Sequence, residues 1–184
     1  MCSLLRGATK VLDPQEDRPV LIFDAMNLFL RVYAANPSIS QHGHHVGGVV
    51  GFLKSMRNII DRFSPRKIFV VWEGGGSSRR RAIYPDYKKG KKPARMNRFY
   101  EQDIPDTQRN RNKQIAALIS AMKNLPICQI YVSDCEGDDV IGYLCKYKLR
   151  KESKVIVSSD QDYYQLLNDR TQIFRLGRKE IVTY

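Results

Sequence analysis

Four short apolar runs, separated by stretches with a helical pattern, limit what this chain can fold into more than any other feature of its sequence. The runs are VLIF at 20–23, KIFVVW at 67–72, ICQIYV at 127–132 and KVIVSS at 154–159. Their nearly continuous β-branched character is typical of strands that are covered on both faces, as in a parallel sheet. Strands that alternate with helices predict an α/β domain with right-handed crossovers.

The stretches between these runs show helical periodicity. Apolar residues recur every three or four positions over 49–63, and Ser64 and Pro65 are expected to end that helix. Further helices are expected over 112–125, directly after EGDD at 136–139, and over 161–169. The tail IFRLGRKEIVTY predicts two short strands that turn near Gly177.

Acidic residues follow every one of the predicted core strands. Because the carboxyl ends of parallel strands meet at one edge of a sheet, we expect these acids to gather there. Two like charges about 4 Å apart cost roughly 4 kcal/mol at an effective dielectric of about 20, so a close group calls for a cation or exposure to solvent. Single acids could be ordinary strand ends or helix caps, but capping does not explain four strand ends at once. The seven acids are Asp24, Glu73, Glu136, Asp138, Asp139, Asp160 and Asp162.

The surroundings of these acids indicate which cation they would bind. Oxygen ligands without a nearby His or Cys favour Mg²⁺ or Mn²⁺, hard ions that carboxylates and substrate phosphates hold together. The four cysteines form no CxxC pair, so neither a zinc site nor a disulfide framework is indicated. The segment QHGHH at 41–45 has no carboxylate or cysteine beside it, and we expect a flexible loop there. We therefore expect Mg²⁺ or Mn²⁺ at the edge of the sheet.

Positive charge is concentrated in one segment of the chain. Of a net charge of +12, the stretch 79–113 holds an excess of eight, with twelve Lys or Arg and four acids. It lies in a long insertion, 74–112, that is rich in Gly, Ser, Pro, Arg and Lys. Insertions of this length in compact domains are usually functional or disordered. We expect it to clamp single-stranded nucleic acid through its charge, with a solvated, charge-rich loop as the alternative.

Length and hydropathy limit the remaining possibilities. With 184 residues, 42% of them apolar, the chain is long enough for one domain with a sizeable core, expected over 19–184. Residues 1–18 have no feature that suggests a role and are expected to be a disordered leader. No apolar run approaches the roughly 18 residues that a membrane helix needs, and no signal peptide is evident. We therefore expect a cytoplasmic protein without a membrane partner.

Four segments, in this order and spacing, resemble the 5′ nuclease family of phage flap endonucleases, 5′-to-3′ exonucleases and the 5′ nuclease domain of bacterial DNA polymerase I. They are LIFDAMNLFLR, VVWEGGGSSRRRAIYPDYKKGKK, SDCEGDDVIGYL and VIVSSDQDYYQLL, and the resemblance covers about 19–184. It implies a PIN-like, or resolvase-like, α/β domain with a mostly parallel sheet flanked by helices and a basic arch at 74–112. The expected host is a bacterial cell or one infected by a phage.

Position by position, the resemblance also implies roles for individual residues. All seven acids occupy metal-ligand positions. Lys88 lies where an arch lysine contacts the scissile phosphate, and Arg31 and Arg81 occupy further phosphate-contact positions. Tyr33 is a candidate for stacking on a base, with packing in the core as an equal alternative. The other residues implied in nucleic-acid binding are Arg79, Arg80, Tyr84, Tyr87, Lys89, Lys91 and Lys92.

The implied activity is metal-dependent hydrolysis of phosphodiesters in DNA replication and repair. The expected substrate is DNA with a 5′ end or flap, and an RNA–DNA hybrid is a further candidate. Two ions about 4 Å apart would activate a water and stabilise the leaving 3′ oxygen. We expect Asp24, Glu136 and Asp160 to hold the first ion most directly.

Three features depart from the family's pattern. Ala25 replaces the Gly that usually follows the first acid, and Glu73 stands where Asp is frequent. Family members continue into a helix-hairpin-type region that binds duplex, whereas this sequence stops at Tyr184, so we expect a missing segment or a second chain to supply that half. Two alternatives therefore remain open: a PIN-type ribonuclease, and a catalytically silent nucleic-acid-binding module.

Overall fold

The structure is a computed structural model that describes residues 18–75, 78–87 and 108–184. The expected leader lies almost entirely outside the described residues, and so does the centre of the basic insertion. The side chain of Arg79 also lies outside them. No helix within the described ranges is long and apolar enough to span a membrane.

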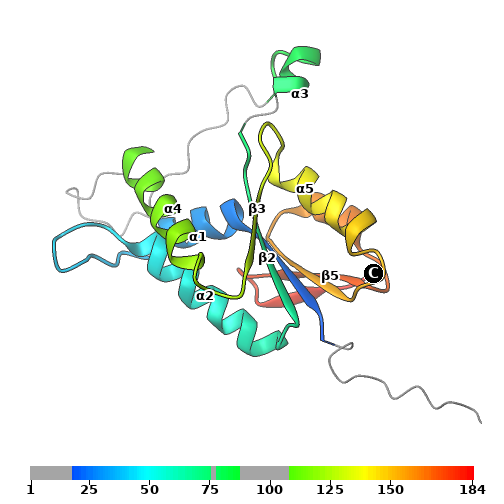
Figure 1. The fold of residues 1–184 in the computed structure, drawn as a ribbon, viewed down its shortest axis with the longest axis horizontal. Coiled ribbons are helices and arrows are strands. Elements are labelled where there is room, and N and C mark those ends of the chain that lie inside the picture. The colour runs from blue at the N-terminus through cyan, green and yellow to red at the C-terminus, as the bar shows by residue number, and fades with distance from the viewer. Residues whose placement is uncertain (1–17, 76–77, 88–107) are drawn as a thin grey trace, which may run out of the picture.

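Six strands form one sheet in the order β3-β2-β1-β4-β5-β6 (Figure 1). Strands β1 to β5 run parallel to one another, and β6 runs antiparallel to β5. All four predicted core strands are present, as is the pair of short strands predicted in the tail, so the expected mostly parallel α/β sheet is confirmed. The strands are β1 (Val20–Asp24), β2 (Lys67–Trp72), β3 (Cys128–Tyr131), β4 (Lys154–Val157), β5 (Thr171–Arg175) and β6 (Glu180–Val182).

Helices cover both faces of the sheet because alternate residues of each central strand point to opposite sides. In β1, Leu21 and Phe23 pack into one core cluster, whereas Val20 and Ile22 pack into the other. The first cluster includes residues of α1 (Ala25–Ala35), α2 (Gly47–Phe63) and α4 (Gln108–Met122). The second includes residues of α5 (Gly137–Tyr143), the π-helical turn η1 (Leu144–Lys148) and the 3₁₀ helix η2 (Gln161–Leu166). Figure 1 shows the two sets on opposite sides of the sheet.

Two of the helices were not predicted from the sequence. Helix α1 follows β1 without a loop and buries Leu28, Phe29 and Tyr33 against the sheet. Helix α3 (Ser78–Ile83) lies inside the basic insertion, beyond the ends of β2 and β3 (Figure 1). Helix α4 starts at Gln108, four residues before the predicted start at 112. Helix α2 ends as predicted, because Ser64 adopts the left-handed conformation with φ 43°.

The loop before α2 differs from its expectation. Residues 41–44 are exposed, but His45 is buried and its Nε2 lies 2.9 Å from the carbonyl oxygen of Asn36. Its Nδ1 faces the side-chain amides of Asn110 and Gln114. His45 is therefore a structural residue that joins this loop to α4, rather than part of a flexible loop.

Tyr33 belongs to the same buried region. It is 1% exposed, its ring stacks on Phe29 and its hydroxyl accepts a hydrogen bond from Asn110. A ring in this position has no free face for a base, so the stacking prediction for Tyr33 is wrong and the alternative of core packing holds.

Candidate metal centre

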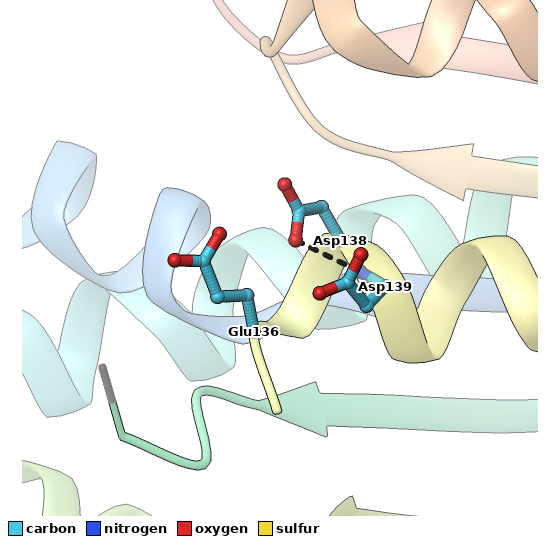
Figure 2. Close-up of side chains that lie close together, drawn as sticks. All are labelled: Glu136, Asp138 and Asp139. Atoms are coloured by element: carbon cyan, nitrogen blue, oxygen red, sulfur yellow. Dashed lines mark hydrogen bonds between the residues drawn. The ribbon is translucent and has the colours of Figure 1, made fainter. Parts of the chain in front are cut away.

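The EGDD segment forms the start of α5 at the carboxyl edge of the sheet. Glu136 has an extended backbone and caps the helix, so Asp138 and Asp139 fall in its first turn. The three side chains each offer a carboxylate oxygen, and these oxygens all lie within 4.8 Å of one another (Figure 2). We call these three residues the EDD group. Glu136 is only 1% exposed, so solvent alone cannot relieve the repulsion within the group.

Arg80 of α3 supplies the positive charge that this group needs. Its Nη1 donates to Glu136 Oε2 and its Nη2 donates to Asp139 Oδ1, both at 2.5 Å. The hydroxyl of Tyr87 donates to the same oxygen of Glu136 at 3.1 Å. The Arg80 guanidinium also lies 5.5 Å from the centre of the Tyr87 ring. A side chain from the basic insertion thus lies where the carboxylates call for a cation.

Two features of the neighbouring loops bring Arg80 to this place. Asp134, in the left-handed conformation with φ 58°, accepts hydrogen bonds from the backbone and the hydroxyl of Ser78 at the start of α3. Gly74 lies so close to Val132 that a Cβ at this position would come within 1.6 Å of its carbonyl oxygen. The amide of Gly74 also donates to the carbonyl of Cys135. The end of β2 is therefore held against the loop that leads into the EDD group.

Burial and repulsion act on the protonation of the EDD group. Burial is the main cause that raises the pKa of Asp138, and the charges of Asp139 and Glu136 raise it further. The backbone amide of Asp139, which donates to Asp138 at 2.8 Å (Figure 2), and the charge of Arg80 act in the opposite direction. A carboxylate with a raised pKa gains more than an ordinary one when a cation arrives.

Asp24 is stabilised differently, by neutral donors. It caps α1 through the amide of Asn27, and its Oδ2 accepts from the hydroxyls of Ser158 and Tyr163, each at 3.1 Å. Burial is the largest cause that raises the pKa of Asp24, and the charge of Asp160 adds to it. The hydrogen bonds lower that pKa in part.

Asp160 and Asp162 lie at the start of η2. The Asp160 side chain accepts from the amide of Asp162 at 3.0 Å, and its own amide donates to Ser158 Oγ. The hydroxyl of Ser158 therefore links Asp24 to Asp160. Burial is the main cause that raises the pKa of Tyr163, and the charges of Asp24, Asp138 and Asp160 act in the same direction. Tyr163 lines one pocket together with Asp138 and Asp162. The acids of the separate strands thus share one edge, as the sequence predicted.

The detailed grouping of the acids differs from the prediction. Asp24, Glu136 and Asp160 were expected to hold the first ion together, but in the described part of the chain the close group is Glu136, Asp138 and Asp139. Asp24 and Asp160 lie outside it because their oxygens are held by α1, η2 and Ser158. Glu73 links β2 to the EDD group, since it accepts from the amide of Gly137 at 3.3 Å.

The basic and aromatic candidates fall into three sets. Arg31 is exposed and donates to Ser159 Oγ at 3.0 Å, next to Asp160. Arg81, on α3, and Tyr84, directly after it, are exposed. Arg80 and Tyr87, also predicted to bind nucleic acid, contact Glu136. Four predicted lysines lie outside the described residues: Lys88, Lys89, Lys91 and Lys92.

Sequence reasoning missed several residues that build this site. Ser158 and Tyr163 hold Asp24, and Asn27 accepts from the amide of Ser159, which joins α1 to the end of β4. Asp134 holds α3. Ser158 and Tyr163 could have been suspected from their position beside the acids in SSDQDYY, but their partner lies more than 130 residues away.

The donor set fits a hard divalent cation. The EDD group presents carboxylate oxygens only, its most buried member already binds a cationic group, and the donors come from a rigid helix start. The Arg80 guanidinium, which binds two of these carboxylates, occupies a position that suits a metal cation. The chemistry of the site therefore suits a divalent cation held by carboxylate oxygens.

Known proteins resemble this chain in sequence and in fold. A model of the family described as "5'-3' exonuclease, N-terminal resolvase-like domain" matches residues 19–184. A flap endonuclease Xni of Shewanella sp. (strain MR-4) is 33% identical over 151 residues, which cover 82% of this chain and 52% of that protein. One from Psychromonas ingrahamii is 29% identical over 160 residues, covering 84% and 55%. The chain thus spans about half the length of these relatives.

Solved structures give the same fold. The T5 D15 protein, co-crystallised with metal ions, superposes with a TM-score of 0.67 at 18% identity. The match covers 90% of this chain and 58% of that one. A T5 5′-exonuclease structure with bound zinc gives a TM-score of 0.65 at 17% identity.

Proposed function

The chain belongs to the family of 5′-3′ exonuclease N-terminal resolvase-like domains, and from this premise we propose that it hydrolyses phosphodiester bonds in DNA with the help of Mg²⁺ or Mn²⁺. The main support is the EDD group, three carboxylates within 4.8 Å at the carboxyl edge of a parallel sheet. The substrate we propose is DNA with a free 5′ end or a flap, and RNA–DNA hybrids are a further candidate. The names of the relatives, flap endonuclease and 5′-3′ exonuclease, agree with this choice.

We assign metal binding to the acidic residues and phosphate contact to the basic ones. The EDD group would hold the cation, and Asp24, Glu73, Asp160 and Asp162 would complete the acidic edge for a second ion and its waters. When bound, such ions supply an activated water and stabilise negative charge on the phosphate. Arg31 and Arg81 would contact phosphates, together with Lys88 of the insertion, which neutralises charge that develops at the cleaved bond.

We further propose that residues 74–112 form a basic arch over this edge and that 19–184 is one nuclease domain. The exposed side chains of Arg81 and Tyr84 support the arch, since they are available to a strand. A further segment or a second chain would bind the duplex part of the substrate. We expect the protein to act in the cytoplasm, where such substrates arise in replication and repair.

The activity can be tested with labelled substrates. The chain is incubated with Mn²⁺ and a 5′-labelled flap, a nicked duplex, an RNA–DNA hybrid and single-stranded RNA, and the products are sized. Replacing Asp138 and Asp139 by Ala should abolish cleavage. Asp61→Asn, which removes an exposed acid of α2 paired with Arg57, serves as the control and should leave cleavage unchanged.

The same experiment separates the alternatives. Cleavage of single-stranded RNA but not of the flap would replace the proposal by a ribonuclease. Calorimetry that detects no Mg²⁺ or Mn²⁺ binding to the wild type, together with no cleavage, would identify a silent binding module. If the double Ala variant of Asp138 and Asp139 cleaved as well as the wild type, the EDD group would have no role in the reaction.

A further inference from the structure

A pocket of about 590 Å³ opens beside the EDD group and continues along the helix away from it. Its lining includes Arg80, Asp138 and Asp139. It also includes Tyr143, Lys146 and Tyr147 along α5 and η1, and residues of η2. The pocket therefore joins the acidic centre to a surface for which the proposed function has no role.

Helical spacing creates this continuity. Asp139, Tyr143 and Tyr147 are four residues apart and so lie on one stripe of the helix. At 1.5 Å per residue, Tyr147 lies roughly 12 Å along the axis from Asp139. Lys146 lines the same pocket. A π-helical turn, which often occurs at functional sites, carries Lys146 and Tyr147.

The two tyrosines are exposed as a pair. Tyr143 is 51% exposed and Tyr147 is 69% exposed, and their ring centroids are 5.2 Å apart with planes 37° apart. Neither ring is covered by the core clusters. Exposed single tyrosines are common, but two adjoining rings in a pocket offer flat faces on which an aromatic group can stack.

The surrounding charge indicates what that aromatic group is attached to. Residues 143–151 contain four basic residues, Lys146, Lys148, Arg150 and Lys151, and no acid. Nζ of Lys148 lies 6.0 Å from the centre of the Tyr143 ring. Flat rings interleaved with cations match an anion that carries aromatic groups at intervals, which describes a nucleic-acid strand.

We propose that Tyr143 and Tyr147 form a stacking surface for unpaired bases of the strand whose phosphate reaches the EDD group, and that Lys146 contacts the backbone of that strand. The inference rests on the proposed function and specifies where a neighbouring part of the substrate lies. Stacking uses the face that every base has, so this surface holds the strand without reading its sequence. It also requires unpaired bases, because the faces of paired bases are already stacked in a duplex.

The test measures binding without cleavage. A fluorescein-labelled single-stranded DNA is titrated with protein in EDTA, and affinity is read by anisotropy. Replacing both Tyr143 and Tyr147 by Ala should weaken binding by about 10-fold or more, since stacking contributes roughly 1 to 3 kcal/mol per base and 1.4 kcal/mol corresponds to tenfold. Replacing both by Phe should preserve the affinity, and Lys146→Ala should reduce its salt dependence.

Matched controls separate stacking from a general loss of structure. Tyr131→Ala removes a ring of similar exposure, 64%, that does not line the pocket, and it should bind as the wild type does. A 2-aminopurine base in the strand gives a second readout, because its fluorescence is quenched on stacking and should recover with the double Ala variant. The thermal midpoint of each variant reports on folding.

Each outcome decides one of the two proposals. Wild-type binding by the double Ala variant would overturn the stacking surface, and cleavage of flaps by that variant would leave the proposed function in place. Equal weakening by the Phe and Ala variants would assign the effect to the hydroxyls and also overturn stacking. Weaker single-strand binding by the Ala variant, in a protein that cleaves none of the substrates, would support the surface and reject the nuclease activity.

Discussion

The two acidic groups at the edge of the sheet are stabilised in opposite ways. The EDD group is neutralised by Arg80, a charged residue from another element whose side chain is 38% exposed. Asp24 is held instead by hydroxyls and an amide that carry no charge. A bound cation could therefore take the place of Arg80 at the EDD group, whereas in the described part of the chain the oxygens of Asp24 are held by neutral groups.

This difference indicates which group determines metal affinity and which determines the shape of the site. Arg80 belongs to a helix of six residues in the basic insertion, so its position depends on what the insertion binds. Ser158 and Tyr163, which hold Asp24, are almost fully buried. The EDD group thus has a charged partner that comes from the insertion, whereas Asp24 is held by buried residues of the fold.

The largest effect is expected for Glu136→Gln, which removes the buried charge of the EDD group. Turnover should fall by about 100-fold or more, the usual cost of losing one electrostatic contact in an active site. Calorimetry with Mn²⁺ should show weaker binding as well. Unchanged turnover would indicate that Asp24 and its neighbours, rather than the EDD group, support the reaction.

Arg80→Ala should come next and separates the two groups most directly. Without metal, the free energy of unfolding should fall by about 2 kcal/mol, because Glu136 is left buried without its partner. The cost is lower than for a fully buried pair because the side chain of Arg80 is partly exposed. Mn²⁺ should restore more stability to this variant than to the wild type.

Urea unfolding with EDTA and with Mn²⁺ measures both quantities. Arg57→Ala is the control, because its pair with Asp61 at 3.7 Å is exposed on both sides and should contribute less than about 1 kcal/mol. If Mn²⁺ stabilised wild type and Arg80→Ala equally, Arg80 and the cation would not share these carboxylates.

Asp24→Asn should change the free energy of unfolding by a smaller amount and in the opposite direction. Removing a buried charge without a counter-charge should stabilise the metal-free protein by about 1 kcal/mol near neutral pH while activity falls. Burial raises the pKa of Asp24 above its ordinary value of 3.8, so the folded wild type takes up a proton more readily than the unfolded chain. The wild type therefore gains stability as the pH falls through this raised pKa towards 3.8.

The stability difference between Asp24→Asn and the wild type should thus shrink on acidification. Urea unfolding in EDTA at a series of pH values measures it. A difference that stays constant with pH would mean that Asp24 is not held as a buried, ionised carboxylate.

The smallest effect is expected for Asp162→Asn. Asp162 is exposed and its amide, not its carboxylate, holds Asp160, so the free energy of unfolding should stay within about 0.5 kcal/mol of the wild type. Metal affinity, read by calorimetry, should fall by less than it does for Glu136→Gln. A loss of stability comparable to that of Arg80→Ala would show that Asp162 belongs to the EDD group.

Much of the fold could be read from local pattern. The strand at 67–72 was predicted with its observed ends, and the α2 helix ended at Ser64 as expected, because continuous β-branched runs and helical spacing report directly on burial. Helix α1 escaped notice since it follows β1 without an intervening loop. Helix α3 was hidden because it is short and carries charges on half of its positions.

The sequence by itself determined that seven acids follow the ends of parallel strands and that a basic insertion lies between two of them, because strand order and charge are local properties of the chain. Only the tertiary structure decided that Arg80, rather than solvent, balances the charge of the EDD group, and that Ser158 and Tyr163 hold Asp24. Those pairings join residues 56 to 139 positions apart. Such long-range contacts depend on how the loops that contain Gly74 and Asp134 pack together, and no spacing in the sequence predicts these contacts.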